Sequence, residues 1–327
     1  MSIETVAPPK RPRRRDRAPE DGNVRERAKG FDKIWILVFL APFLLLYLGF
    51  TLWPLVATVW YSFFDWSGFG PLDEWVGTEN YVSVLNDDLF WFAVLNTVIF
   101  AVLNTAIKLP LSLFVAVLLT RKWLRGKKVF RTVFFAPLII PVAMAGLVFT
   151  YLLNPSNGAL NSLLRDLGII EESVDVFAGR WSALIVLVLV SIWQIFGQYM
   201  IYWMAALQNV PEELYEAADI DGASAWQKLT MITLPMIRPV AVIIVLLALI
   251  NAMHVFGLVV TLTGGGPGTS TYVVSYFIYQ EAFGTVPFEY GYASAAALLF
   301  SVIAFIMVTS QGAFVRKANR LRKEYGV

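Results

Sequence analysis

Two carboxylates close together are the first residues in this sequence that could do chemistry. Asp219 and Asp221 flank one isoleucine, and a pair at this spacing could hold a divalent metal for glycosyl transfer to a membrane lipid. Both fall at a predicted helix end, where acids often serve as solvated caps. His254 is the single histidine and the chain has no cysteine, which excludes two-histidine and thiolate metal sites. We therefore expect no metal site, no catalytic residues and no enzymatic activity.

A glycine cluster could cradle phosphate groups. The stretch LTGGGPGTST, residues 262–271, has the glycines but is followed by no Lys-Ser or Lys-Thr pair and preceded by no predicted strand. The whole sequence also contains no GxxxxGK[ST] motif. The chain therefore cannot bind the phosphates of ATP by itself, and the cluster is interpreted as a helix stop followed by a loop.

The elements that carry these residues are membrane spans. Hydrophobic residues make up 57% of the 327 residues and charged residues 15%, where soluble domains carry about a quarter. A helix needs roughly 20 apolar residues to cross a bilayer. Six longer runs have no charge, or one in the case of the second: Ile34–Phe64, Leu89–Thr120, Thr132–Leu164, Trp181–Pro211, Pro239–Gln280 and Tyr290–Val315. The sequence predicts an all-α polytopic membrane protein with six transmembrane helices.

The distribution of lysine and arginine predicts the orientation of the spans. Of 26 such residues, 23 lie in the termini and in the loops on the same side, two lie in the other loops, and Lys108 lies within a span. Positive residues favour the cytoplasmic side. Both termini, and the loop 209–238 between the fourth and fifth spans, are therefore expected in the cytoplasm.

The chain divides into a membrane domain and two basic tails. Residues 1–30 are rich in proline and charge and are expected to be disordered, and 317–327 form a second basic cytoplasmic tail. Between them, 31–316 form the six-helix domain. Next to a span, the basic N-terminal segment PKRPRRRDR is expected to contact anionic membrane lipid rather than nucleic acid.

The loop 209–238 contains the segment EELYEAADIDGASAWQKLTMITLP and is predicted to form two helices joined by a turn. Asn209 is expected to cap the first helix, and Gly222 permits a tight backbone between the helices. Pro235 is expected to stop the second helix before a fifth span that begins at Pro239. Such a projection could insert into a groove of another protein, or it could be an ordinary amphipathic connector.

Shorter signals lie near the other spans. TENYVSVLNDDLFW is expected to form a short interfacial helix capped by Thr78 or Asn80, and NPSNGALNSLLRDLGI a turn followed by a short helix. In the sixth span, Gly291 with Ala295 and Ser294 with Ala297 are spaced for close approach of another helix.

Several of these segments resemble one family. Glu216-Ala217-Ala218, then Gly222, then Ile232-x-Leu234-Pro235 resemble the EAA signature of binding-protein-dependent ABC importer permeases. Further segments are similar to the carbohydrate branch of that family, the maltose and glycerol-phosphate type: VGTENYVSVLNDDLFWFAVLNT, NPSNGALNSLL, TLTGGGPGTSTYVVSYFIYQEAF and GYASA. Together these matches cover most of residues 30–316. The longer basic N-terminal tail, Lys108 and His254 belong to no motif of the family.

The resemblance implies the permease subunit of an ATP-driven carbohydrate importer, with the type I ABC importer permease fold. It implies a second permease chain, two ATPase subunits that hold ATP and Mg, and an extracytoplasmic solute-binding protein, in a bacterial or archaeal cytoplasmic membrane. The coupling loop would contact one ATPase through Glu216, Ala217, Ala218, Asp221, Gly222, Leu234 and Pro235. A related permease for a polyol or glycerol-phosphate ester remains an alternative, and a secondary transporter a further one.

The resemblance also places the solute cavity among the later spans. Ser191, Gln194 and Gln198 form one polar stripe at i, i+3 and i+7, and Asn251 and His254 stand three residues apart. With Trp193 and Tyr199 these residues are the candidates for binding sugar hydroxyls and rings. Hydrogen bonding between helices is the alternative role for the polar candidates, and packing for His254.

Lys108 is the costliest residue of the spans. Two explanations stay open, because its side chain could reach the membrane surface or could be buried with a partner or a cavity role.

Overall fold

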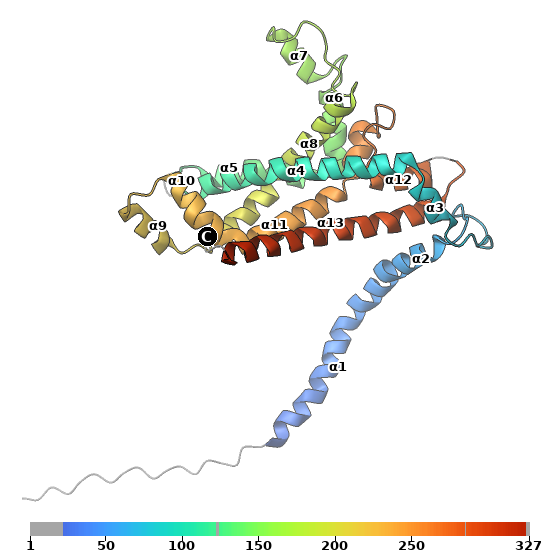
Figure 1. The fold of residues 1–327 in the computed structure, drawn as a ribbon, viewed down its shortest axis with the longest axis horizontal. Helices are drawn as coiled ribbons and strands as arrows, with labels where there is room; N and C mark the ends of the chain where they lie inside the picture. Colours follow the sequence, from blue (N-terminus) through green and yellow to red (C-terminus); the bar gives the residue numbers. More distant parts are fainter. Residues whose placement is uncertain (1–21, 122–123, 285, 325–327) are drawn as a thin grey trace, which may run out of the picture. The chain divides into compact units, whose positions relative to one another are not determined.

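The structure is a computed structural model that describes residues 22–121, 124–284 and 286–324, with side chains described only between 34 and 310 of those ranges (Figure 1). Within these ranges the chain is helical, and its one β-type contact is an isolated antiparallel bridge between Phe64 and Trp75. Contacts divide the chain into two units, Met1–Ala57 and Thr58–Val327.

The first unit contains the first span. Helix α1 covers Gly22–Tyr47, a π-helical turn η1 covers Leu48–Leu52, and α2 runs from Trp53 to Tyr61 into the second unit. The span Ile34–Tyr61 buries none of the residues in its most apolar window. The predicted disordered tail lies outside the described residues up to position 21, and from Gly22 onward the chain is helical.

The second unit contains the remaining helices. Its first half consists of α3 (Glu79–Leu85), α4 (Asp88–Thr120), α5 (Lys127–Phe135), the 3₁₀ turn η2 (Ala136–Ile139), α6 (Val142–Leu152), α7 (Ala159–Asp166) and α8 (Arg180–Leu207). They are followed by α9 (Glu212–Ile220), α10 (Ala225–Gln227), η3 (Lys228–Thr233), α11 (Leu234–Met253), η4 (Val259–Thr263), α12 (Val274–Tyr279), η5 (Gln280–Gly284) and α13 (Tyr290–Glu324). Both predicted short helices are present, as α3 and α7.

Five helices in the described chain are long and apolar enough to cross a membrane, and a bent pair makes a sixth span. The pair is Lys127–Ile139 and Val142–Leu152, whose axes differ by 97°. The sequence analysis did not predict this break. Its cause is Pro141, because the residue before a proline is driven out of the helical region and Ile140 is extended, with ψ 124°. The expectation of six spans is confirmed when the bent pair is counted as one.

The fifth span begins and ends at other residues than the sequence analysis predicted. The chain is helical without interruption from Ala225 to Met253, so Pro235 does not stop the second loop helix. Pro235 is the second residue of α11 and directly follows the π-helical η3, where the regular ladder of α-helical hydrogen bonds is already interrupted. The helix then ends at Met253, earlier than expected, and the turn η4 continues the segment up to Gly264.

The two interrupted segments pack against each other. A Cβ on Gly146 of α6 would lie 1.8 Å from Oγ1 of Thr261, and one on Gly257 would lie 2.8 Å from the side chain of Val142. Thr150 donates a hydrogen bond to the carbonyl of Thr261 at 3.1 Å. The third and fifth spans therefore meet where both are broken.

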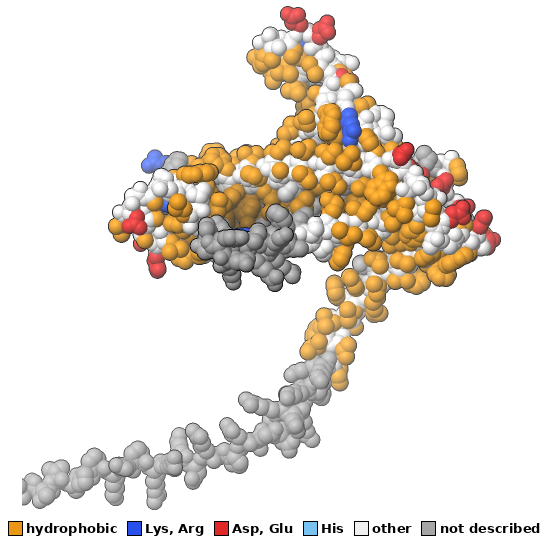
Figure 2. Space-filling model, viewed as in Figure 1, with side chains coloured by type: hydrophobic (Ala, Val, Ile, Leu, Met, Phe, Trp, Pro, Cys, Tyr) orange, Lys and Arg blue, Asp and Glu red, His pale blue; other side chains and the backbone are white. Residues whose placement is uncertain are grey.

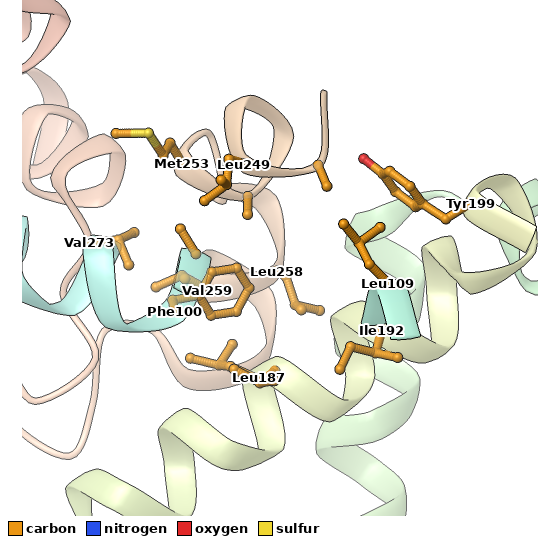
Figure 3. Packing of buried hydrophobic residues seen from close by; sticks show 14 of the residues in the cluster. Phe100, Leu109, Leu187, Ile192, Tyr199, Leu249, Met253, Leu258, Val259 and Val273 are labelled. Carbon is orange, nitrogen blue, oxygen red and sulfur yellow. The ribbon is translucent and has the colours of Figure 1, made fainter. Parts of the chain in front are cut away.

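The core of the second unit lies among α4, α8, α11 and the segment after α11. Side chains such as Phe100, Leu187, Leu258 and Val259 are at most 2% exposed and interdigitate in this region (Figure 3). In contrast, apolar side chains cover much of the outer surface in Figure 2, while several acidic groups lie at the helix ends. This distribution is the one expected of helices that face lipid.

The end of the second unit that carries α3 is closed by tight backbone contacts. A Cβ on Gly291 would lie 1.9 Å from the carbonyl oxygen of Phe64, so the predicted close approach involves a loop at this position. Asn80 donates to the carbonyls of Ser62 and Phe64 at 3.0 and 2.9 Å and does not cap α3. Thr78 occupies the capping position without a side-chain hydrogen bond. Ala295 is fully buried, as the close-packing prediction requires.

Candidate functional site

The predicted coupling loop forms a helical hairpin at one end of the second unit, opposite to α3 (Figure 1). Helix α9 ends at Ile220, and the chain then turns at Gly222, whose φ of +75° lies in the left-handed region. Ser224 begins the next helix with a capping box, in which its hydroxyl accepts from the amide of Gln227. The predicted cap Asn209 is wrong, because its amide donates backward to the carbonyl of Ala205 at 3.2 Å.

Side-chain contacts hold the two arms of the hairpin together. Lys228 forms an ion pair with Asp219, and the hydroxyls of Tyr215 and Thr233 are hydrogen-bonded at 2.8 Å. Both contacts join α9 to η3. The hairpin is thereby a defined projection rather than a loose connector.

The signature residues divide between the two sides of α9. Glu216 and Ala217 are exposed, whereas Ala218 is buried against its own chain and its carbonyl accepts from the amide of Ala223 at 2.8 Å. Asp221, Gly222, Leu234 and Pro235 are exposed. Of the two alanines, only Ala217 has a side chain available to a partner.

A cavity of about 690 Å³ lies behind the hairpin, between α9 and the ends of α4, α5 and α8. Arg121, Lys127 and Arg131 line one part of it, and the acidic residues Glu216 and Asp219 line another. Glu216 therefore belongs to a mixed-charge cavity within its own chain, which sequence reasoning did not foresee.

The predicted polar stripe of α8 is satisfied within the chain. Ser191 accepts from Nδ2 of Asn104 at 3.0 Å, and Gln194 donates to the carbonyl of Ile140 at 3.0 Å. Gln198 donates to the hydroxyl of Tyr202 at 2.7 Å. Ser191 and Gln194 therefore connect α8 to other segments, as the alternative interpretation proposed, and the Gln194 bond lies at the break between η2 and α6; the Gln198 bond stays within α8.

The other solute candidates differ in exposure. Trp193, Asn251 and His254 are exposed, and Tyr199 is fully buried. Asn251 donates to the hydroxyl of Tyr199 at 3.1 Å, and Nδ1 of His254 lies 2.7 Å from the carbonyl oxygen of Ile250. Of these four residues, Trp193, Asn251 and His254 have side chains that a solute could contact directly, and Tyr199 does not.

Lys108 is buried, so the explanation that it reaches the membrane surface is wrong. Its side chain is 0% exposed and donates to Oδ1 of Asn104 at 2.8 Å. The ammonium also lies 4.2 Å from the centre of the Tyr199 ring. A lysine and an asparagine spaced i and i+4 inside an apolar run are the sequence signal that could have indicated this pair.

Sequence reasoning also missed the polar groups that hold the glycine-rich loop. Nδ2 of Asn96 donates to the carbonyls of Ser270 and Tyr272 at 3.0 and 2.9 Å, and its Oδ1 accepts from Arg180 at 2.9 Å. Thr97 accepts from the amide of Val274 at 3.0 Å. The loop is therefore anchored to α4 rather than free.

This bundle of apolar helices with an exposed hairpin between two spans defines a polytopic membrane protein. Residues 108–320 match the model of the family described as binding-protein-dependent transport system inner membrane component. The chain belongs to this family, and it is a multi-pass component of the inner membrane and a permease-type subunit.

Curated relatives and solved structures agree with this assignment. The chain is 34% identical to a probable ABC transporter permease, YurN of Bacillus subtilis, over 87% of this chain and 97% of the relative. It is 30% identical to the trehalose/maltose transport permease MalF of Thermococcus litoralis, over 93% and 100%. A crystal structure of a bacterial ABC transporter that imports the acidic polysaccharide alginate matches with a TM-score of 0.76 and 26% identity, over 89% and 99%. The fold is that of ABC importer permeases.

Proposed function

We propose that this chain forms half of the transmembrane pathway of an ATP-driven carbohydrate importer. Its spans would pair with a second permease chain, and two ATPase subunits that bind ATP and Mg would supply the energy. An extracytoplasmic binding protein would deliver the solute. The similarity to permeases for maltose and trehalose supports a carbohydrate as the solute. Both termini would lie in the cytoplasm of a bacterium or archaeon.

The observation that carries the coupling role is the braced hairpin of α9 and η3. It projects from the bundle between the fourth and fifth spans, and α9 presents an exposed acid and a small residue, Glu216 and Ala217. The ion pair Lys228–Asp219 fixes its two arms, so a force applied to α9 reaches α11 without being absorbed in a flexible loop.

The proposed mechanism is alternating access. ATP-driven closure of the ATPase dimer would draw the hairpins of the two permeases together and turn the cavity outward. Hydrolysis would then return it to the inward-facing state. The contact of Gln194 with Ile140 connects α8 to the broken third span, so movement at the α8 end of the hairpin can reach that break.

Crosslinking tests the coupling surface. The sequence has no cysteine, so Ala217→Cys introduces a single thiol. In native membranes a bifunctional maleimide should join Ala217→Cys to a nucleotide-hydrolysing subunit, and the buried Ala218→Cys should react less. Ser156→Cys, exposed beside α7, is the matched control and should capture no ATPase. Absence of any ATPase adduct from both alanine positions would refute the coupling role.

A further inference from the structure

Lys108 is a buried amine with no acidic partner among the side chains that the structure describes. Its side chain is 0% exposed within α4. Among the described side chains, those of residues 34–121, 124–284 and 286–310, no carboxylate oxygen lies within 4.0 Å of its Nζ. Burial of an ammonium group without an anion is costly, and ionisable groups inside membrane spans commonly mark solute or ion pathways.

The partners of the Lys108 amine are those that suit a cation. Nζ donates one hydrogen bond, to Oδ1 of Asn104, and lies 4.2 Å from the centre of the Tyr199 ring. Asn104 in turn donates to Ser191 of α8 at 3.0 Å, which orients its carbonyl oxygen toward the amine. An aromatic face and an amide oxygen stabilise a positive charge without neutralising it. No described carboxylate therefore cancels the positive charge that this amine carries when it is protonated.

Contacts lead from Lys108 to the surface of α11. The hydroxyl of Tyr199 accepts a hydrogen bond from Nδ2 of Asn251 at 3.1 Å, and Asn251 is exposed. His254 is also exposed, three residues further along the chain and directly after the end of α11. Polar side chains on a span ordinarily face protein or a water-filled cavity rather than lipid. The Asn251 side of α11 is therefore a surface that a solute could contact in the assembled importer.

The electrostatic effect at that surface is large enough to measure. Contacts through Tyr199 place Nδ2 of Asn251 within about 10 Å of the ammonium. A unit negative charge bound there would gain roughly tenfold in affinity, for an effective dielectric constant of about 20. A neutral solute would gain almost nothing from the same field.

We propose that Lys108 makes the transport pathway prefer carbohydrate-like solutes that carry a carboxylate or phosphate group, with Asn251 as their contact at the exposed end. Lys108 is thus a specificity-determining residue that acts through space rather than by touching the solute. The proposal rests on the proposed function, because it requires that the Asn251 surface lines the solute pathway.

A purely structural role for Lys108 makes a different prediction. If the amine only joins α4 to α8 through Asn104, its removal weakens the bundle and lowers transport of every solute by the same factor. The two roles are therefore separated by a ratio between solutes, not by the absolute rate.

The experiment uses the complete importer in proteoliposomes with its own binding protein. Two matched pairs serve as probes, glucuronate against glucose and glycerol 3-phosphate against glycerol. ATP-dependent uptake is measured for each, and the separately measured affinity of the binding protein is divided out. The chain carries Lys108→Met, and Lys108→Gln, which keeps a donor for Asn104, serves as a second variant. Lys128→Met, an exposed lysine of α5, is the matched control.

Wild type and Lys128→Met should favour the anionic member of a pair by about tenfold. Lys108→Met and Lys108→Gln should bring that ratio close to one while uptake of the neutral member changes little. An unchanged ratio in either Lys108 variant would overturn the proposal. A wild-type importer that favours the neutral member, or a binding protein that binds neither anionic probe, would overturn it as well.

These outcomes also separate the inference from the proposed function. ATP-dependent uptake of neutral carbohydrates without a charge preference leaves the importer assignment intact and removes the role of Lys108. If no carbohydrate, neutral or anionic, stimulates ATP hydrolysis by the complex, the proposed function itself fails.

Discussion

The turn at Gly222 offers a quantitative test of the coupling hairpin. Its φ of +75° is a left-handed conformation, and a Cβ at this position would meet no atom within 4 Å. The cost of alanine is therefore the backbone strain alone, about 1–2 kcal/mol for a left-handed residue with a side chain. This corresponds to a roughly 5- to 30-fold smaller population of the native turn if no other contact compensates.

Three substitutions at Gly222 should form a graded series. Asparagine tolerates the left-handed region and should leave ATP-dependent uptake close to wild type. Alanine should lower uptake by at most the roughly 5- to 30-fold factor expected for the population of the native turn. The decrease should be smaller if the Lys228–Asp219 ion pair holds the turn in its native shape. Proline cannot adopt a positive φ and lacks the N–H that donates to the carbonyl of Asp219 at 3.2 Å, so uptake should be abolished.

The assay is solute uptake together with ATP hydrolysis stimulated by the binding protein, each normalised to the amount of chain in the membrane. Gly70→Ala is the matched control, because Gly70 has a φ of +82° and equally open surroundings but lies before α3 at the other end. It should keep full coupling. Wild-type uptake by Gly222→Pro would refute the reasoning that the shape of this turn transmits force.

Three further predictions concern the end of the second unit that carries α3. Gly291→Val should destabilise the fold by about 1–3 kcal/mol or more, since its Cβ would lie 1.9 Å from the carbonyl oxygen of Phe64. Asp87→Ala should cost about 2–4 kcal/mol, because Asp87 caps α4 and accepts a hydrogen bond from Tyr292 at 2.7 Å. Burial, and then neighbouring carboxylates, raise the pKa of Glu281, so folding favours its protonated form. The free energy of unfolding should therefore fall as the pH rises from about 4.5 through the raised pKa. Glu281→Gln should remove this pH dependence.

Thermal unfolding in detergent measures all three, with a control for each. Gly49→Ala adds a methyl group where no atom lies within 4 Å, and it should leave the midpoint nearly unchanged. Asp88→Ala removes the adjacent exposed acid, which accepts no bond from Tyr292, and should cost less than Asp87→Ala. An equal pH dependence in wild type and Glu281→Gln would show that another group titrates.

The class of protein follows from sequence because it depends on composition and local pattern. Lipid contact requires long apolar helices whatever their partners, so uncharged runs such as Trp181–Pro211 predict spans directly. The turn of the hairpin was predictable for a similar reason. A tight turn with a positive φ favours glycine, and Gly222 is the glycine of this loop. The motif around Glu216 indicated the family, which the comparisons confirm.

What the tertiary structure decided concerns contacts between distant segments. Nothing local distinguishes Ala217 from Ala218, yet only packing of the second arm buries Ala218. Pro235 reads as a helix stop in sequence, but the preceding π-helical turn lets it begin α11. The partners of Lys108 are Asn104 on α4 and Tyr199 on α8, and Tyr199 lies 91 residues further along the chain. The spacing of Lys108 alone therefore could not decide between burial and exposure. Sequence determines which segments enter the membrane because that free energy is a sum over single residues, whereas the fate of each polar group depends on which helix packs beside it.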